Sequence, residues 1–317
     1  ETGGGYGGYA VEKKGDASVA LVGPPSVGKS TLLNAVTNAD SETGSYEFTT
    51  LEVIPGMLEY RGAKIQLLDV PGLIGGAAEG KGGGKQVLSV VRNSDLVLMM
   101  ASPDSLDSFE EMEQELYDAG LRLDQEPPKV KITKKDSGGL SIRSTVEQSE
   151  IDEETIEEVM REKGYVNASV VLREELSMDR LIDAISDNRR YLPSVKAVNK
   201  VDDLGERERE ELRREVEDAV LVSAEEGEEL ERLKEQLWEQ LELMRVYMKK
   251  PGKDPDREEP LIVERGSTIG EVLDTLAGDF SNFRHARIWG SSADFPEQKV
   301  GEEHVLEDED VVELRTS

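Results

Sequence analysis

The residues best suited to chemistry near the start of the chain form a phosphate-binding pattern. Residues 23–30 read GPPSVGKS and match G-x-x-x-x-G-K-[ST], with a β-branched run before them and helical spacing after them. Glycines let backbone N–H groups wrap phosphates, and the N-terminus of the next helix adds partial positive charge. We expect Lys29 to reach the β- and γ-phosphates and the Ser30 hydroxyl to bind Mg²⁺. The other expected nucleotide contacts in this segment are Gly23, Ser26, Val27, Gly28 and Thr31.

A second pattern, DVPG at residues 69–72, closes a strand-like run that begins at Ala63. It predicts the Asp69 carboxylate near Mg²⁺ and the Gly72 N–H beside a γ-phosphate. Clusters of Asp, Pro and Gly are also typical of simple turns. The position after a strand, downstream of Ser30, favours the nucleotide role.

The third pattern, NKVD at residues 199–202, follows an apolar strand and bears on the choice of base. A carboxylate at Asp202 can accept two hydrogen bonds from guanine, whereas adenine lacks the matching donors, so GTP is favoured over the alternative, ATP. Asn199 and Lys200 complete the motif, and a backbone N–H at Ser223–Ala224 is expected to meet the guanine carbonyl. In isolation, Asp202 or Asp203 would be read as a helix cap.

The composition is strongly acidic. The 317 residues include 68 Asp and Glu against 38 Lys and Arg, a net charge of −30, and only 11 of the acidic residues lie in the first 100. Such a surface stays soluble in concentrated salt, so we expect a salt-loving source. The alternative is an acidic interaction face on an ordinary protein.

Other features narrow the class of protein. The longest apolar run, at residues 96–101, is far shorter than the roughly 20 residues that cross a bilayer, so no membrane association is expected. The chain has no cysteine and no apolar signal core, which makes a cytoplasmic location the default. His285 and His304 are isolated and suggest neither a metal site nor a catalytic base.

Strands alternate with helices in the first part of the chain, which predicts a doubly wound, mostly parallel α/β sheet. A leucine stripe at 230–244, with Trp238 beside it, should be a helix packed on that sheet. The expected organisation is a glycine-rich linker at 1–14, a nucleotide-binding domain at 15–120 and 191–248, an inserted α+β subdomain at 121–190, a linker at 249–259 and a C-terminal domain at 260–317.

With these patterns in hand, the chain resembles the Obg-related GTPases, and within them the developmentally regulated GTP-binding (DRG) family. The resemblance is carried by GPPSVGKSTLLNAVTNADS, YEFTT at 46–50, DVPGLIGGAAEGKGGGKQVL and NKVD. It covers residues 15–317 and implies a P-loop GTPase domain, an inserted subdomain and a C-terminal TGS domain of β-grasp fold. The family's N-terminal helical segment is expected to be missing here.

The resemblance also implies roles and partners. Thr50, with Thr49 as the alternative, would close on Mg²⁺ and the γ-phosphate. The TGS domain and the family's association with translation imply contact with RNA or ribosomes, whereas the strongly acidic segment 260–317 also suits a protein-docking module.

One basic cluster interrupts the acidic half of the chain. Lysines at 129, 131, 134 and 135 are expected on a hairpin of Val130–Thr133 and Leu140–Thr145, with Arg143 on the opposing strand. They could contact phosphates, or they could be solvated side chains on an exposed hairpin.

These features together predict a Mg²⁺-dependent GTPase that hydrolyses GTP to GDP slowly and acts as a switch; the alternative is an RNA- or ribosome-binding adaptor that holds guanine nucleotide statically. The residue after Gly72 is Leu73, which cannot orient water as a glutamine does. We therefore expect help from a protein partner or a cation, and the resemblance to glutamine-lacking Obg-like GTPases implies K⁺ as that cation. Ser26 and backbone carbonyls near Thr50 would be the K⁺ ligands.

Overall fold

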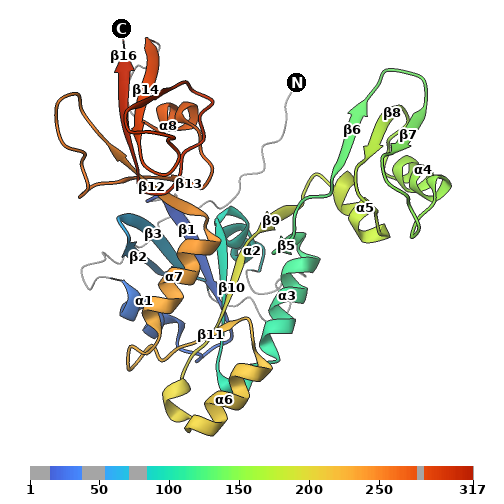
Figure 1. Ribbon diagram of the computed structural model, residues 1–317. Helices are drawn as coiled ribbons and strands as arrows, with labels where there is room; N and C mark the ends of the chain where they lie inside the picture. The colour runs from blue at the N-terminus through green and yellow to red at the C-terminus, as the bar shows by residue number, and fades with distance from the viewer. Residues whose placement is uncertain (1–14, 38–53, 71–83, 277–281, 317) are drawn as a thin grey trace. The chain divides into compact units, whose positions relative to one another are not determined.

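The computed structural model describes residues 15–37, 54–70, 84–276 and 282–316 (Figure 1). The expected contacts of Thr49, Thr50, Gly72 and Leu73 lie outside these ranges. The chain divides into two compact units, one made of residues 1–116 and 193–317 and the other of residues 117–192.

The first unit contains a six-stranded sheet that matches the expected doubly wound, mostly parallel fold. Its spatial order is β11-β10-β4-β1-β3-β2. All neighbours are parallel except β2 and β3, which form a hairpin at its edge, where Arg61 and Gly62 turn the chain with positive φ. The strands are β1 (Ala17–Val22), β2 (Ile54–Tyr60), β3 (Ala63–Asp69), β4 (Leu96–Ala101), β10 (Ser194–Val198) and β11 (Ala219–Leu221).

Helices cover both faces of this sheet because its inner strands are apolar on both sides. β1 and β4 are buried along their whole length. Apolar residues of α1 (Lys29–Val36) and α7 (Leu230–Gln240) share one core with alternate residues of β1, β3, β4 and β10. Lys196 of β10 points to the other face, where it meets Glu113 and Phe109 of α3 (Ser108–Asp118). Among the described residues, the other helices around this sheet are α2 (Gly84–Asn93) and α6 (Glu206–Glu215), with short 3₁₀ turns at Pro103–Ser105 and Val201–Asp203.

A second, five-stranded sheet completes the first unit in the order β13-β12-β16-β14-β15. β12 and β16 run parallel and the other pairs antiparallel, and α8 (Ile269–Thr275) packs on one face, as in a β-grasp fold. The strands are β12 (Leu243–Met248), β13 (Leu261–Glu264), β14 (Phe283–Trp289), β15 (Gln298–Val300) and β16 (Asp310–Thr316).

The leucine stripe is a helix for only part of its expected length. Leu230, Leu233, Leu237 and Trp238 are buried against the large sheet, as expected. However, α7 ends at Gln240, Glu242 adopts a left-handed φ of 51°, and Met244 lies on β12 in the core of the second sheet. Leucine and methionine suit either a helix or a buried strand, so the spacing alone did not reveal this change.

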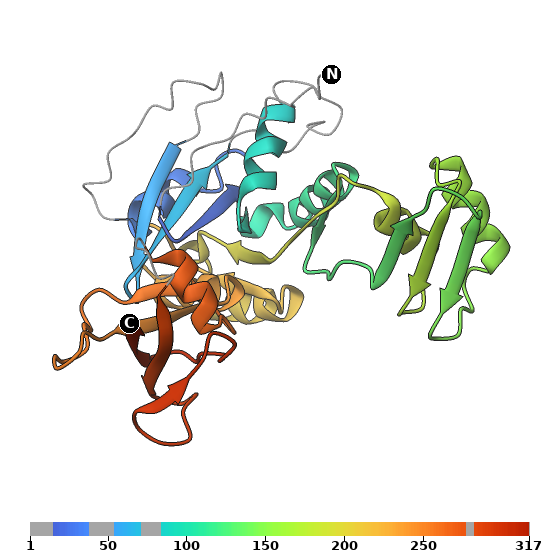
Figure 2. The ribbon, with the colours of Figure 1, turned by 90° about the horizontal axis from the view of Figure 1, so that it is seen from above.

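The second unit has an α+β fold of its own, drawn in green tones in Figure 2. β5 (Leu121–Leu123) and β9 (Arg190–Leu192) pair in parallel where the chain enters and leaves the unit. A three-stranded sheet follows, made of β6 (Val130–Lys134), β7 (Leu140–Ser144) and β8 (Ala168–Leu172), with helices α4 (Glu153–Glu162) and α5 (Met178–Ile185).

The expected hairpin of β6 and β7 is wrong. The strand order is β6-β8-β7, with β8 antiparallel to β6 and parallel to β7. β8 is buried on alternate residues and takes the central place because Ala168, Val170 and Leu172 are fully buried. Arg143 therefore lies two strands away from the lysines of β6.

Candidate nucleotide-binding site

The loop from Gly23 to Ser30 connects β1 to α1, and neighbouring atoms leave no room for a side chain at either of its two glycines. A Cβ on Gly23 would lie 2.4 Å from the carbonyl oxygen of Met100, and one on Gly28 would lie 2.4 Å from Nδ2 of Asn199. Gly28 also has a φ of 92°, in the left-handed region. These glycines therefore let the loop pack against the ends of β4 and β10.

Lys29, the first residue of α1, folds its side chain back over this loop. Its Nζ donates to the carbonyl oxygens of Gly23, at 2.9 Å, and Pro24, at 3.0 Å. Burial lowers the pKa of Lys29 below its ordinary value, and the charge of Asp69 opposes that shift. The ammonium group is thus held inside the loop by two carbonyl oxygens, which a phosphate could replace as a stronger partner.

Ser30 and Asp69 meet at the carboxyl edge of the sheet. The Ser30 hydroxyl donates to Oδ2 of Asp69 at 3.1 Å, although the two residues are 39 positions apart in the chain. A hydroxyl and a carboxylate are the hard oxygen ligands that Mg²⁺ prefers, so this donor set fits the ion. Within the described residues, no group of three or more His, Cys, Asp and Glu side chains could hold a metal by itself.

Asn199 connects the phosphate loop to the loop after β11. Its side-chain amide is buried; Nδ2 donates to the Val27 carbonyl and Oδ1 accepts from the Ala224 N–H, each at 2.9 Å. The neighbouring Lys200 has a φ of 67°, which turns the chain out of β10. The sequence motif predicted a nucleotide-binding role for Asn199 but not the two hydrogen bonds by which Asn199 joins these loops. The positive φ of Lys200 could not be predicted either, because lysine rarely adopts that conformation.

Asp202 lies in the 3₁₀ turn at Val201–Asp203 and is half-buried. Its carboxylate makes no hydrogen bond or ion pair within the part of the chain that the structure describes. It thus differs from Asp69, which has a partner. The turn itself is fixed by a hydrogen bond from the Val201 N–H to the Val222 carbonyl.

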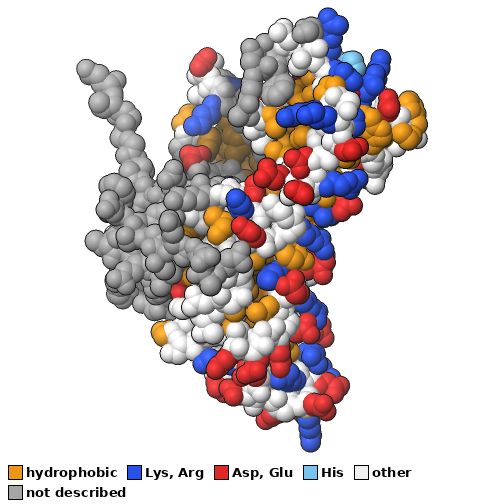
Figure 3. Space-filling model, turned by 90° about the vertical axis from the view of Figure 1, so that its left-hand side faces the viewer, with side chains coloured by type: hydrophobic (Ala, Val, Ile, Leu, Met, Phe, Trp, Pro, Cys, Tyr) orange, Lys and Arg blue, Asp and Glu red, His pale blue; other side chains and the backbone are white. Residues whose placement is uncertain are grey.

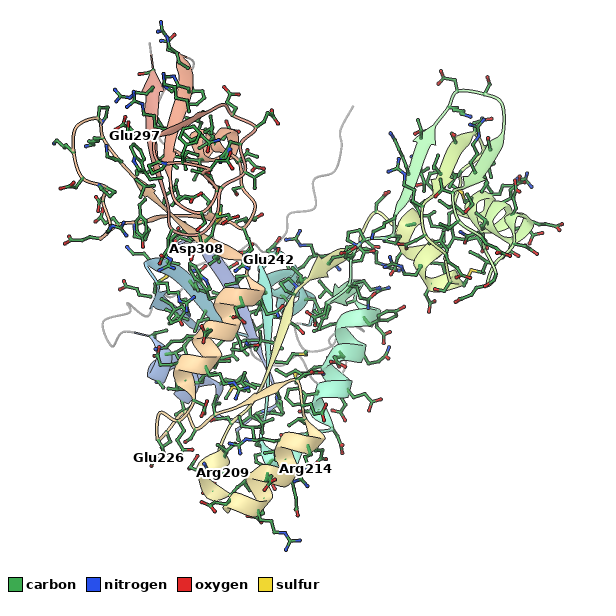
Figure 4. The ribbon with its side chains drawn as sticks, in the orientation of Figure 1. Arg209, Arg214, Glu226, Glu242, Glu297 and Asp308 are labelled. Carbon is green, nitrogen blue, oxygen red and sulfur yellow. The ribbon has the colours of Figure 1, made fainter. Side chains whose placement is uncertain are left out.

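The segment at Ser223–Ala224 lies beside Asn199, and both of its N–H groups already have partners. Ser223 donates to the Glu228 carbonyl at 3.2 Å, and Ala224 donates to Asn199 as above. The Ser223 hydroxyl accepts from the Glu226 N–H, which closes a tight loop before α7. Figure 4 shows Glu226 at this end of α7, and the neighbouring Glu228 pairs with Arg209 of α6 at 2.8 Å.

The other residues predicted to contact the nucleotide differ in how exposed their side chains are. Val27 is 2% exposed and anchors the loop, whereas Ser26, Ser30 and Thr31 are exposed at its open side. Ser26 has a φ of 65°, so it also sits in the left-handed region. The structure therefore gathers all predicted contacts within its described residues from four loops at one edge of the sheet, and Thr50 and Gly72 lie outside those residues.

Three family models match consecutive parts of this chain. Residues 18–135 match the model described as 50S ribosome-binding GTPase, and residues 137–243 match the C-terminal region of the same domain. Residues 244–316 match the TGS domain, in agreement with the β-grasp sheet that begins at β12.

Full-length relatives decide the family. A GTP-binding protein of the halophilic archaeon Halobacterium salinarum is 51% identical over 98% of this chain and 86% of its own length. Developmentally-regulated GTP-binding protein 1 of Xenopus laevis is 41% identical, again over 98% of this chain and 86% of its own length. The chain belongs to the DRG family of GTP-binding proteins. The fold of this DRG protein is also found in the YchF GTPase of Schizosaccharomyces pombe, at a TM-score of 0.51 and 14% identity over 96% of this chain and 99% of the other.

Membership of the DRG family gives the site its ligand, a guanine nucleotide, and makes GTP hydrolysis the expected activity. It also agrees with the fold of a P-loop GTPase domain carrying an insertion and a TGS domain. Among the described residues, no helix has the length and apolar character needed to cross a membrane.

Proposed function

We propose that this DRG protein binds GTP with Mg²⁺, hydrolyses it slowly to GDP and phosphate, and uses the cycle as a switch in the cytoplasm. The main supporting observation is the Asn199 amide, which ties the phosphate loop to the two loops that would hold the base. Lys29 and Gly28 would bind the phosphates, Ser30 and Asp69 would hold Mg²⁺, and Asp202 would accept from guanine. When bound, Mg²⁺ would neutralise charge on the phosphate oxygens.

Nucleotide binding and turnover by the full chain test this proposal. We expect tight binding of GTP and GDP, weak binding of ATP, and phosphate release that requires Mg²⁺ and is lost in Lys29→Ala. Tight ATP binding, or phosphate release unchanged by EDTA, would contradict it. The adaptor alternative predicts equal partner affinity with GDP and with a non-hydrolysable GTP analogue.

The second part of the proposal concerns how the water molecule that attacks the γ-phosphate is activated. Leu73 follows Gly72 where a glutamine would orient water, and an added positive charge of the arginine-finger kind contributes about 10³ to 10⁵ in rate. We propose that K⁺ or a protein partner supplies this charge, with Ser26 and carbonyls near Thr50 as the K⁺ ligands. Ser26 is exposed at the open side of the loop, which is compatible with that role.

Turnover in KCl and NaCl at equal ionic strength separates this role from screening. We expect faster phosphate release in KCl, because screening treats both cations alike. Ser26→Ala should reduce the difference between the two salts. Equal rates of phosphate release in the two salts would exclude the K⁺ role. A fast rate in the absence of both cations would show that the site hydrolyses GTP without an added positive charge, even with Leu73 in place of a glutamine.

The partner belongs to the same proposal. The match to the 50S ribosome-binding GTPase model and to the TGS domain supports a ribosome or RNA as the target of the switch, with a further protein that stabilises or activates it.

A further inference from the structure

The three-stranded sheet of the second unit has one covered face and one open face. Val130 and Ile132 of β6, Val170 and Leu172 of β8, and Leu140 and Ile142 of β7 all pack into the core shared with α4 and α5. Because side chains alternate along a strand, the residues between them point to the opposite face. The described residues of this unit include no helix whose core contacts lie on that face.

The strand register places the side chains of the open face in rows. Lys131, Val171 and Arg143 form one row, and Thr133, Ser169 and Ser141 form the next. Backbone hydrogen bonds extend the sheet by one row at each end, from Arg173 to Lys129 and from Lys135 to Asn167. The open face therefore carries five basic residues, one row of three hydroxyl residues, and no acidic residue.

The basic composition of the open face differs from that of the rest of the second unit. Residues 117–192 contain 17 acidic and 12 basic side chains, and none of the acidic ones falls in these rows. Lys129 pairs with Glu126 at 3.2 Å. Lys131, Lys135, Arg143 and Arg173 are exposed and make no ion pair within this fully described unit. The open face thus presents unneutralised positive charge on an acidic protein.

We propose that this open face docks the sugar-phosphate backbone of double-stranded RNA. Phosphates are the strongest partners for clustered Lys and Arg side chains, and Ser, Thr and Asn add contacts to phosphate and sugar oxygens. Proteins that grip single strands stack bases on aromatic rings, but none of the rows contains an aromatic residue. Double-stranded RNA needs no such platform, because it is read through phosphates and 2′-hydroxyls across a shallow minor groove.

The rows place cations on both sides of the hydroxyl residues. Lys131 on β6 and Lys135, which directly follows β6, are four residues apart, which corresponds to about 13 Å of extended chain, and the hydroxyl row lies between them. Cations at both ends would contact phosphates while Thr133, Ser169 and Ser141 face the 2′-hydroxyls. This inference supplies a surface for the proposed RNA-directed role. It uses none of the nucleotide-site residues, so either proposal can fail alone.

Charge reversal on the two faces of the same sheet tests the inference. The variant K131E/R143E removes two cations from the open face. The matched control is Lys134→Glu, because Lys134 is on β6 but points to the helix side, where its Nζ lies 5.3 Å from the Tyr165 ring centroid. Full-length proteins are titrated with a 20-base-pair RNA duplex, a DNA duplex of the same sequence, and polyglutamate, over a range of KCl concentrations.

We expect RNA-duplex affinity to fall about tenfold or more at 0.2 M KCl in K131E/R143E, and the slope of log K against log salt to fall by about 2. Lys134→Glu should bind RNA like the unmodified protein. GTP binding and thermal unfolding, measured for each variant, confirm the fold; if K131E/R143E unfolds, K131Q/R143Q takes its place. No RNA binding, equal loss in the control, equal affinity for DNA, or a preference for polyglutamate would each overturn the proposal.

Discussion

At the scale of single residues, the site depends on one buried amide. Asn199 joins the carbonyl of Val27 to the N–H of Ala224 and fills the space that a side chain at Gly28 would need. A buried amide that loses such partners costs about 1 to 3 kcal/mol per unsatisfied group. The loop that would bind phosphates and the loops that would bind the base are therefore positioned together.

The choice of base is predicted to depend on Asp202. Replacing Asp202 by Asn should weaken GTP binding by at least tenfold and favour xanthosine triphosphate, whose 2-carbonyl accepts from an amide donor. Titration of both nucleotides, with ATP beside them, measures the change. Asp203→Asn is the control, because Asp203 lies in the same turn but is exposed. A variant Asp202→Asn that still prefers GTP would show that guanine is selected elsewhere.

At the scale of elements, a buried ion pair stabilises the second unit near its two-stranded ribbon. Arg122 on β5 makes two hydrogen bonds to Asp183 of α5, at 2.6 and 2.8 Å, and Arg189 donates to the same carboxylate. The side chains of Arg122 and Asp183 are each 3% exposed. The guanidinium of Arg122 also lies 3.6 Å from the Tyr117 ring centroid. These contacts hold α5 against the strand through which the chain enters the unit.

We predict that Asp183→Asn destabilises this unit by about 3 kcal/mol, because it leaves a buried Arg uncompensated. Burial by itself would raise the pKa of Asp183, but the hydrogen bonds from Arg122 and Arg189 outweigh it and hold the pKa below its ordinary value. The stabilisation is therefore present above about pH 4 and is lost as the pH falls through the folded-state pKa. Denaturant unfolding at pH 7 measures the loss, and Asp187→Asn, at an exposed position, should be neutral. Equal stability of both variants would contradict the prediction.

The sequence predicted elements well where pattern and local motif agreed. The helical spacing after the GPPSVGKS pattern corresponds to α1 (Lys29–Val36), and the longest apolar run, at residues 96–101, corresponds to strand β4. The pairing of β6 with β8 could not be predicted, because β8 follows 23 residues after β7 ends and its pairing depends on tertiary packing. Likewise, the site loops were located from motifs, but the hydrogen bonds that Asn199 makes depend on how β10 and β11 align.

At the scale of the whole molecule, charge sets the conditions for stability. The net charge is −30; Figure 3 shows Asp and Glu interspersed with Lys and Arg at the end of the molecule where α6 lies. In α6, Glu210 pairs with Arg214 and Arg207 with Glu211. Exposed pairs of this kind contribute little, so the excess of acidic residues still repels itself at low ionic strength.

We therefore predict that thermal unfolding moves upward by several degrees between dilute buffer and molar KCl. The relative from a halophilic archaeon supports this expectation. Differential scanning calorimetry measures the midpoints, with NaCl as a control that should act in the same way, because screening does not depend on the cation. A midpoint that stays constant or falls with salt would indicate an acidic protein adapted to ordinary ionic strength.

The short connection between α7 and β12 determines where this chain can be cut. Only Leu241 and Glu242 separate the helix that packs on the large sheet from a strand that lies between β13 and β16 in the small one. Figure 4 shows Glu242 and Asp308 at this junction, and Asp308 holds Arg245 of β12 through two side-chain hydrogen bonds. A fragment that started in the proline-rich stretch at 249–259 would lack β12, leaving β13 without its partner and the edge of β16 open to other chains. A recombinant fragment of the C-terminal domain should therefore begin at Leu243, the first residue of β12, and not at Leu261, the first residue of β13.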